Sequence, residues 1–321
     1  MAEKAVSTEE LMARQALPLD TKMALSQEAA RRWYEHWHGN VYIAFSGGMD
    51  STVLVHLVRS VYPDVPAVCI DGLLYPEIRD HVRSTPDVTI LRPDKSFPQI
   101  IEEYGYPVIS KRTAQYIKEV RNADGWTATK RLRLTGVKSN GERSKLGMIP
   151  KKWHYLCDAP FSVSDRCCFW MKKRPSRQVN EAFGYPLLGV RTEEAQQREQ
   201  TYLMHGCNAA DLSFPRSWPM AFWLDSDVWE YVRAYDLAYA ELYDMGYRRT
   251  GCFACMFGVH LEAEPNRFQR MKTTHPRLWD YCIDRLGLGE VLEYINVPYT
   301  DPKQPQLFDV AASGDVLYAV A

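Results

Sequence analysis

The stretch VYIAFSGGMDST, residues 41–52, determines the predicted fold class of this 321-residue chain. Its first five residues are β-branched, aromatic or small and apolar, as is typical of a short buried strand. Residues 52–61 carry apolar side chains at helical spacing, and a serine and two glycines separate the two patterns. The sequence therefore predicts a strand, a glycine-rich turn and a helix in direct succession.

The glycine-rich turn is expected to bind an anion, because backbone N–H groups converge at a helix start and the helix dipole favours negative charge there. Glycines let the backbone approach a phosphate, and hydroxyl side chains add donors. Asp50 is a candidate catalytic residue, placed to bind Mg²⁺ or to orient the loop. A tight connection without a ligand is the structural alternative. The candidate phosphate-binding residues are Ser46, Gly47, Gly48, Asp50, Ser51 and Thr52.

Strand and helix patterns alternate along the first half of the chain. Apolar runs at residues 66–71, 88–91 and 185–190 predict further strands, and residues 21–37 and 75–83 have helical spacing. Parallel neighbouring strands need crossover connections, which these helices would supply. The predicted fold class is α/β, with a doubly wound, mostly parallel sheet and a mainly helical C-terminal part.

Three regions are predicted along the chain. Residues 1–38 form an N-terminal helical segment, residues 39–220 the nucleotide-binding α/β domain, and residues 221–321 a mainly helical C-terminal region. Residues 122–152 are dense in Lys, Arg, Gly and Ser, and are interpreted as a mobile basic loop or insertion. A solvated surface is the favoured role of this insertion, and a lid or a nucleic-acid contact is the alternative.

Composition restricts the cellular context. The formal net charge is −1, no apolar run reaches 18 residues, and the first residues lack the apolar core of a signal peptide. We expect a cytoplasmic protein without a membrane partner. Eight cysteines in a reducing compartment are interpreted first as metal ligands or reactive thiols rather than as a disulfide framework.

Four motifs in order resemble the phosphoadenosine phosphosulfate reductase-like family of the PP-loop ATP pyrophosphatases. They are SGGMDS at residues 46–51, IDGLLYPE at 70–77, GVR at 189–191 with Arg198 downstream, and WLDSDVW at 223–229. The resemblance implies an adenine nucleotide alpha hydrolase-like fold that binds ATP or a related adenine nucleotide with Mg²⁺. Guanidinium groups suit phosphate or sulfate, which they grip with paired hydrogen bonds. The resemblance adds Asp71, Gly189, Arg191 and Arg198 to the candidate nucleotide-binding residues.

Two cysteine pairs carry a second resemblance. Adjacent Cys167 and Cys168, followed about eighty residues later by Cys252 and Cys255 in a Cys-x-x-Cys motif, are similar to the 4Fe-4S site of assimilatory adenylylsulfate reductases. Four thiolates complete the ligand set of such a cluster. A zinc site and buried structural thiols are the alternatives.

Cys207 is a candidate catalytic thiol. It lies in the polar sequence His-Gly-Cys-Asn, where His205 is expected to lower its pKa and make it a nucleophile or persulfide carrier. The alternative is a cysteine fixed by the packing of its loop.

The expected activity follows from two departures from the reductases that this family includes. No cysteine follows Cys282, whereas the reductases use a cysteine in a C-terminal tail, and SGGMDS is the intact ATP-hydrolysing form of the loop. We therefore expect an ATP-dependent sulfurtransferase that adenylates its substrate and inserts sulfur, similar to tRNA thiolases and the iron-sulfur enzyme of DNA phosphorothioation. A phosphosulfate reductase and a non-catalytic iron-sulfur module are the alternatives. Expected partners are a cysteine desulfurase or a thioredoxin-like reductant; a nucleic-acid substrate and a homo-oligomer stay open.

Overall fold

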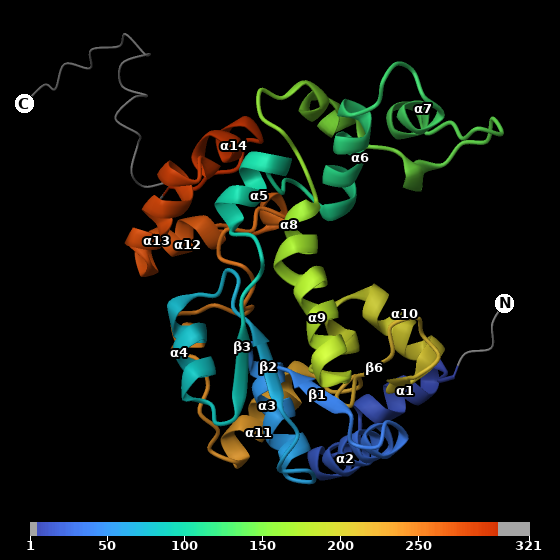
Figure 1. The fold of residues 1–321 in the computed structure, drawn as a ribbon, viewed down its shortest axis with the longest axis vertical. Coiled ribbons are helices and arrows are strands. Elements are labelled where there is room, and N and C mark those ends of the chain that lie inside the picture. Colours follow the sequence, from blue (N-terminus) through green and yellow to red (C-terminus); the bar gives the residue numbers. More distant parts are fainter. Residues whose placement is uncertain (1–4, 301–321) are drawn as a thin grey trace, which may run out of the picture. The chain divides into compact units, whose positions relative to one another are not determined.

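The computed structural model describes residues 5–300 and divides into two compact units (Figure 1). Over the described residues, unit 1 comprises residues 5–97 and 168–253, and unit 2 comprises residues 98–167 and 254–300. This grouping differs from the predicted division at residues 38 and 220, because segments far apart in the sequence pack together in each unit.

Unit 1 contains a six-stranded sheet in the order β3-β2-β1-β4-β6-β5. All neighbours are parallel except β5 and β6, and Ile43 of β1 lies between Ala67 of β2 and Leu187 of β4. The predicted α/β fold with a mostly parallel sheet is confirmed. The strands are β1 (Val41–Ala44), β2 (Ala67–Ile70), β3 (Val88–Leu91), β4 (Tyr185–Leu188), β5 (Asn208–Ala209) and β6 (Arg216–Ser217).

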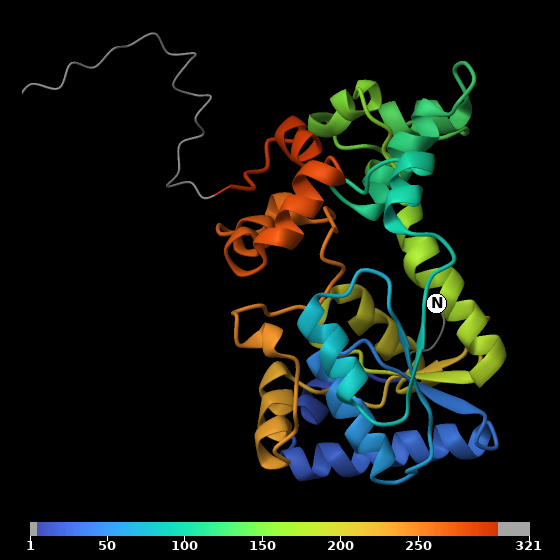
Figure 2. The same cartoon turned by 60° about the vertical axis from the view of Figure 1, so that its left-hand side comes forward.

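Helices cover both faces of this sheet, and Figure 2 shows α2 and α9 on opposite sides of it. On one face α2, α3 and α11 contact one another, and Val53, Leu54 and Leu57 of α3 are fully buried. On the other face Val179 of α9 packs with Tyr42 and Val68 of the sheet. The helices of unit 1 are α1 (Thr8–Gln15), α2 (Leu19–His36), α3 (Met49–Arg59), α4 (Pro76–Ser84), α9 (Arg174–Phe183), α10 (Gln196–His205) and α11 (Asp225–Ala234).

Unit 2 is mainly helical and joins two separate segments of the chain. The Tyr106 hydroxyl donates to the Leu286 carbonyl at 3.0 Å, and Ile109 forms a parallel bridge with Phe257. The helices wholly or mainly in unit 2 are α5 (Phe97–Tyr104), α6 (Lys111–Arg121), α7 (Ala128–Thr135), α8 (Arg166–Cys168), α12 (Arg267–Thr274), α13 (Pro276–Asp280) and α14 (Leu288–Tyr294).

The C-terminal region is mainly helical as far as residue 300, as predicted, and residues 301–321 lie outside the described residues. The region is divided, however: α11 belongs to unit 1, because Val228 and Tyr231 are buried where α11 packs on α2 and α3, whereas α12–α14 belong to unit 2. Among the described helices, none is both long and apolar enough to cross a membrane.

The predicted loop at residues 122–152 is wrong for Ala128–Thr135, which form α7. The Thr127 side chain caps the first turn by accepting from the backbone N–H of Lys130 at 3.1 Å, and Gly136 ends the helix in the left-handed conformation at φ 75°. Two 3₁₀ turns, Lys145–Gly147 and Lys151–Asp158, follow. Capping residues therefore give order to a segment whose composition resembles a loop.

Candidate functional site

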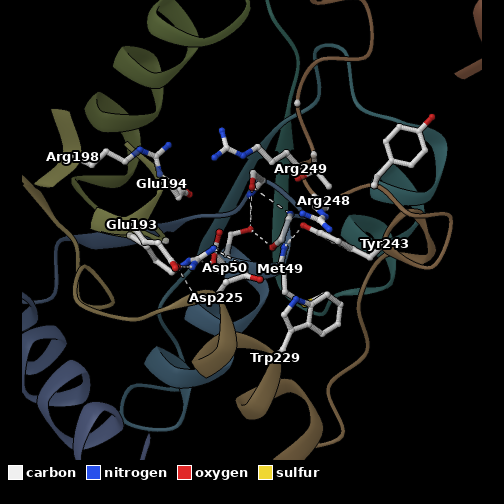
Figure 3. Close-up of a pocket in the computed structure, with 18 of the residues that line it drawn as sticks. Met49, Asp50, Glu193, Glu194, Arg198, Asp225, Trp229, Tyr243, Arg248 and Arg249 are labelled. Atoms are coloured by element: carbon white, nitrogen blue, oxygen red, sulfur yellow. Dashed lines mark hydrogen bonds and ion pairs between the residues drawn. The ribbon is translucent and has the colours of Figure 1, made fainter. Parts of the chain in front are cut away.

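A cavity of about 1070 Å³ opens at the glycine-rich turn between β1 and α3, and all its lining residues belong to unit 1 (Figure 3). The turn, the segment after β4, the start of α11 and residues 243–251 supply its walls. The lining residues used below are Ser46, Gly48, Met49, Asp50, Ser51, Gly189, Arg191, Glu193, Glu194, Arg198, Asp225, Trp229, Tyr243, Arg248, Arg249, Thr250 and Gly251.

The glycines of the turn are required by close packing. Gly47 has φ 72°, and a Cβ there would lie 2.7 Å from methyl carbons of Ile78 and Val82 in α4. A Cβ on Gly48 would lie 2.6 Å from Oγ1 of Thr250. Both positions therefore exclude larger side chains. At Gly47 a side chain would strain the backbone and clash with α4, and at Gly48 it would clash with Thr250.

Hydroxyl side chains of the turn hold its shape. Ser51 Oγ donates to the Gly48 carbonyl at 2.8 Å and accepts from the Ser46 N–H at 3.2 Å. Thr52 Oγ1 donates to the same carbonyl at 3.1 Å and lies 2.9 Å from Nε2 of His81, whose pKa burial lowers. Ser51 and Thr52 therefore stabilise the conformation of the loop, and their predicted contact with phosphate stays a prediction.

The Tyr243 side chain forms a hydrogen bond with a backbone N–H group at the start of α3. Its hydroxyl accepts from the Met49 N–H at 2.7 Å, and Trp229 of α11 packs edge-on to its ring at 6.0 Å. Burial raises the pKa of Tyr243, so the phenol stays neutral. Sequence patterns do not identify Tyr243, because nothing local connects it to a turn that lies 194 residues away.

Arg191 lies at the centre of a carboxylate cluster. Its guanidinium donates to Asp50 at 2.6 Å, to Glu193 at 2.9 Å and to Asp225 at 3.0 Å, and only 7% of the residue is exposed. The structure brings it to the predicted site, but its donors are used by carboxylates and not left open for phosphate. Asp50 and Asp225 lie 141 and 34 residues away from Arg191 in the sequence, so local spacing does not reveal this cluster of carboxylates.

Gly189 lets the end of β4 approach the start of α3. A Cβ there would lie 2.9 Å from the backbone of Asp50. Burial raises the pKa of Asp50, and the neighbouring Arg191 opposes that rise. One Asp50 oxygen, Oδ1, accepts from Arg191, and the carboxylate lines the cavity. A carboxylate facing a phosphate-sized space fits a hard cation such as Mg²⁺.

Three further arginines line the cavity. Arg198 forms an ion pair with Glu194, and burial lowers its pKa. Within residues 5–300, neither Arg248 nor Arg249 forms an ion pair. Figure 3 shows the guanidinium groups of Arg198 and Arg249 pointing toward each other above the turn. Arg248 and Arg249 were missed, although an Arg-Arg pair just before the Cys-x-x-Cys motif was a usable signal.

A second, smaller cavity of about 210 Å³ adjoins the first and shares Ser46, Thr250 and Gly251 with it. Side chains on one face of β1 and β2 form its apolar floor, and Cys252 also lines it. Asp71, a predicted nucleotide-binding residue, lines neither cavity. Its carboxylate instead pairs with Arg79 at 3.0 Å.

The predicted cluster cysteines are distributed over both units. Cys168 and Cys252 belong to unit 1, and Cys167 and Cys255 to unit 2. The backbone carbonyl of Cys255 accepts from Arg267 at 2.9 Å. Four thiols are the right donor chemistry for a 4Fe-4S cluster. Within the described part of the chain, no three His, Cys, Asp or Glu side chains are gathered as a metal-binding group.

Cys207 lies between α10 and β5, outside both cavities. Burial raises the pKa of its thiol to about 11, against smaller opposing effects of Arg14 and Tyr202. His205 lies 3.6 Å from Asp211, measured from Nδ1 to Oδ1. The predicted lowering of the Cys207 pKa is therefore wrong, because desolvation outweighs the neighbouring positive charge. Its role as a sulfur carrier stays a prediction, against which this pKa counts.

Cys207 is expected to resist alkylation in the folded protein. With a pKa of about 11, the thiolate fraction at pH 8 is roughly a thousandth, whereas an unfolded cysteine is substantially ionised. Iodoacetamide labelling at pH 8, followed by peptide mass spectrometry, should show a rate about 100-fold lower than in the urea-unfolded chain. Buried Cys69, whose pKa rises to about 12, is the internal reference for a slow thiol. Equal rates in the folded and unfolded chain would contradict the prediction.

Comparison with known proteins gives the family. The model of the phosphoadenosine phosphosulfate reductase domain matches residues 40–257. An adenosine 5'-phosphosulfate reductase of Staphylococcus saprophyticus is 30% identical over 236 residues, which cover 73% of this chain and 78% of the relative. One from Staphylococcus epidermidis is 23% identical over 227 residues, covering 70% and 74%. The crystal structure of a phosphoadenylyl-sulfate reductase from Candida auris has a TM-score of 0.43 and 18% identity, covering 78% of this chain and 98% of that one. The predicted family is confirmed: this chain belongs to the phosphoadenosine phosphosulfate reductase domain family.

Proposed function

We propose that this chain is an ATP-dependent, iron-sulfur sulfurtransferase that adenylates an oxygen of its substrate and replaces it with sulfur. One observation carries the proposal: an intact SGGMDS turn opens a cavity of about 1070 Å³ whose walls include Arg198, Arg248 and Arg249. A space of this size with three guanidinium groups suits a polyphosphate better than a single sulfate.

The two adjoining cavities suggest how the nucleotide binds. The apolar cavity of about 210 Å³ would take the flat adenine ring, and the larger cavity the phosphates. Backbone N–H groups at the start of α3, other than the Met49 N–H that donates to Tyr243, would face the phosphates, while Asp50 would hold Mg²⁺. Ser51 and Thr52 keep the turn in shape through the Gly48 carbonyl. Arg191 in turn holds Asp50 in place.

The proposed reaction has two steps. The substrate oxygen attacks the α-phosphorus, and the bond to the α,β-bridging oxygen breaks, so that pyrophosphate leaves with the electron pair. Arg198, Arg248 and Arg249 would stabilise the charge that develops on this leaving group. Sulfide-level sulfur then attacks the activated carbon and displaces AMP, which leaves with the substrate oxygen. A cysteine desulfurase would deliver this sulfur as a persulfide, and two electrons from a dithiol such as a thioredoxin-like reductant would release it at the sulfide level. The substitution of oxygen by sulfur itself is redox-neutral.

The cysteine pairs would hold the iron-sulfur cluster in this proposal. Cys167, Cys168, Cys252 and Cys255 supply the four thiolates that a 4Fe-4S cluster needs. A bound cluster supplies iron that can hold sulfur. Cys252 lines the apolar cavity beside the turn, which favours sulfur chemistry close to the nucleotide.

Reduction of an activated sulfate is the second candidate function. The observation that favours it is the sequence similarity to adenosine 5'-phosphosulfate reductases, two of which are 23% and 30% identical to this chain. Such an enzyme would bind a phosphosulfate in the same cavities and would use a thioredoxin-like reductant.

Ligand preference separates these candidates. ATP with Mg²⁺ is expected to bind at least tenfold more tightly than adenosine 5'-phosphosulfate or its 3'-phosphorylated form in calorimetry, and EDTA should weaken ATP binding. Substituting both Arg248 and Arg249 by Gln should weaken the binding of ATP but not of adenosine, because their guanidinium groups line the larger cavity, which would hold the phosphates.

Tenfold tighter binding of a phosphosulfate, a gap of about 1.4 kcal/mol, would favour the reductase instead. Sulfite release with thioredoxin would then confirm that activity. Failure to bind any adenine nucleotide would leave only a non-catalytic module.

A further inference from the structure

Positive charge is concentrated in one part of unit 2. Residues 111–152 contain twelve Lys and Arg against three Asp and Glu, although the whole chain has a net charge of −1. Two of those three acids are already paired, Glu119 with Arg133 at 2.6 Å and Glu142 with Lys138 at 2.9 Å. The segment therefore presents a large excess of cations to solvent.

Six cations of this region are exposed, and we call them together the basic surface. Over residues 5–300, none of the six forms an ion pair with a carboxylate. Exposed cations that lack carboxylate partners and belong to joined segments create a positive potential that attracts polyanions. The basic surface comprises Lys111, Arg112, Arg143, Lys145, Lys151 and Lys152.

The segments that carry the basic surface are joined to one another. Helices α6 and α7 pack together, and Arg133 of α7 donates to the Gly147 carbonyl at 2.9 Å. The Tyr116 hydroxyl of α6 donates to the Leu146 carbonyl at 3.2 Å. The chain around Lys145 is thereby attached to α6, so these cations belong to one folded subregion.

Aromatic side chains belong to the same segments as the cations. Trp126 is 64% exposed and Tyr155 is 37% exposed, while Arg133 stacks on the Tyr116 ring at 3.6 Å from its centroid. An exposed tryptophan gains little from folding, and its flat face is suited to stacking on a nucleobase. Cations that track a phosphate backbone, together with exposed rings, are the combination that binds single-stranded nucleic acid.

An anionic membrane is the competing polyanion, and the structure favours it less. Membrane-surface helices bury a continuous apolar face. The leucines of helix α7, Leu132 and Leu134, are half-buried and therefore form no exposed apolar face, and the exposed apolar side chains Trp126 and Leu146 lie in different segments outside it. A single exposed ring such as that of Trp126 is better suited to stacking on a base than to insertion into a lipid bilayer.

We propose that the basic surface binds the phosphodiester backbone of single-stranded RNA or DNA, with Trp126 stacking on a base. The full-length protein, purified anaerobically, is titrated into fluorescent 20-nucleotide RNA, the matching DNA and duplex DNA, and anisotropy is followed over a range of salt concentrations. Vesicles containing phosphatidylserine provide the lipid comparison. Single strands are expected to bind more tightly than duplex or vesicles, and the ratio of the two single strands identifies the natural polymer.

The variant that tests the surface replaces Lys145, Lys151 and Lys152 by Gln. Its affinity for the single strand should fall at least tenfold, and the slope of log K against log salt should fall by about 2, since each lost phosphate contact removes roughly 0.7. Trp126→Ala should weaken binding about tenfold at an unchanged salt slope. A control of equal charge change replaces exposed Arg32, Arg83 and Arg233 of unit 1 by Gln and should bind as the parent does.

Three outcomes would overturn the proposal: equal losses in the control variant, tighter binding to vesicles than to nucleic acid, or no binding to any strand at low salt. Thermal unfolding followed by circular dichroism verifies that each variant is folded. None of these readouts depends on ATP, so the proposed function and this surface can fail separately.

Discussion

Arg191→Ala is expected to lower the affinity for ATP with Mg²⁺ by about 100-fold, or about 2.7 kcal/mol. The buried guanidinium balances Asp50, Glu193 and Asp225, which together would otherwise place three negative charges beside the bound polyphosphate. Removing one partner of a buried ion pair leaves uncompensated charge, which is costly. The pKa of Asp50, already raised by burial, would rise further without Arg191, so Asp50 would hold Mg²⁺ less well as pH falls.

Charge can be separated from loss of structure by a compensating variant. Arg191→Ala combined with Glu193→Gln and Asp225→Asn removes two of the three carboxylates and should recover at least tenfold in affinity, if repulsion is the cause. Arg191→Lys should recover less, because one ammonium cannot reach three carboxylates in the geometry of a guanidinium. Calorimetry measures each affinity. If a folded Arg191→Ala protein bound ATP with an affinity within threefold of the parent's, Arg191 and its three carboxylate partners would not be part of the nucleotide site.

Cys252→Ala is expected to remove nearly all iron from the anaerobically purified protein. Complete ligation by four cysteines corresponds to about four irons and four sulfides per chain, and loss of one ligand usually destabilises the whole cluster. Iron and sulfide analysis with the visible absorption spectrum measures the loss. Cys157→Ser is the matched control, because Cys157 lies outside both predicted pairs, and it should keep its iron.

The metal content also tests the alternative ligand chemistry. If the protein contained stoichiometric zinc and no iron after anaerobic reconstitution, the four cysteines would be ligands of a zinc ion and not of a 4Fe-4S cluster. Equal iron in the parent and in Cys252→Ala would remove the Cys-x-x-Cys motif from the ligand set.

The sequence alone determined the fold class and identified the glycine-rich turn at which the larger cavity opens, because both depend on local patterns. Residues 41–52 predicted β1, the turn and α3 in order, and residues 88–91 matched β3 in full. Strand and helix periodicity is written in neighbouring residues, and the glycine requirement follows from backbone geometry within a few residues. The helix within the predicted loop was missed, because the bulk composition of residues 122–152 outweighed the capping signals of Thr127 and Gly136.

Only the tertiary structure decided which side chains act together at the site. It joined Arg191 to three carboxylates, brought Tyr243 to the Met49 amide, and paired Asp71 with Arg79 outside both cavities. These contacts link residues far apart in the sequence or depend on how side chains turn, and spacing carries no information about either. The Cys207 pKa shows the same limit: its polar neighbours suggested an ionised thiol, but burial in the folded chain, which sequence neighbours do not report, raises that pKa to about 11.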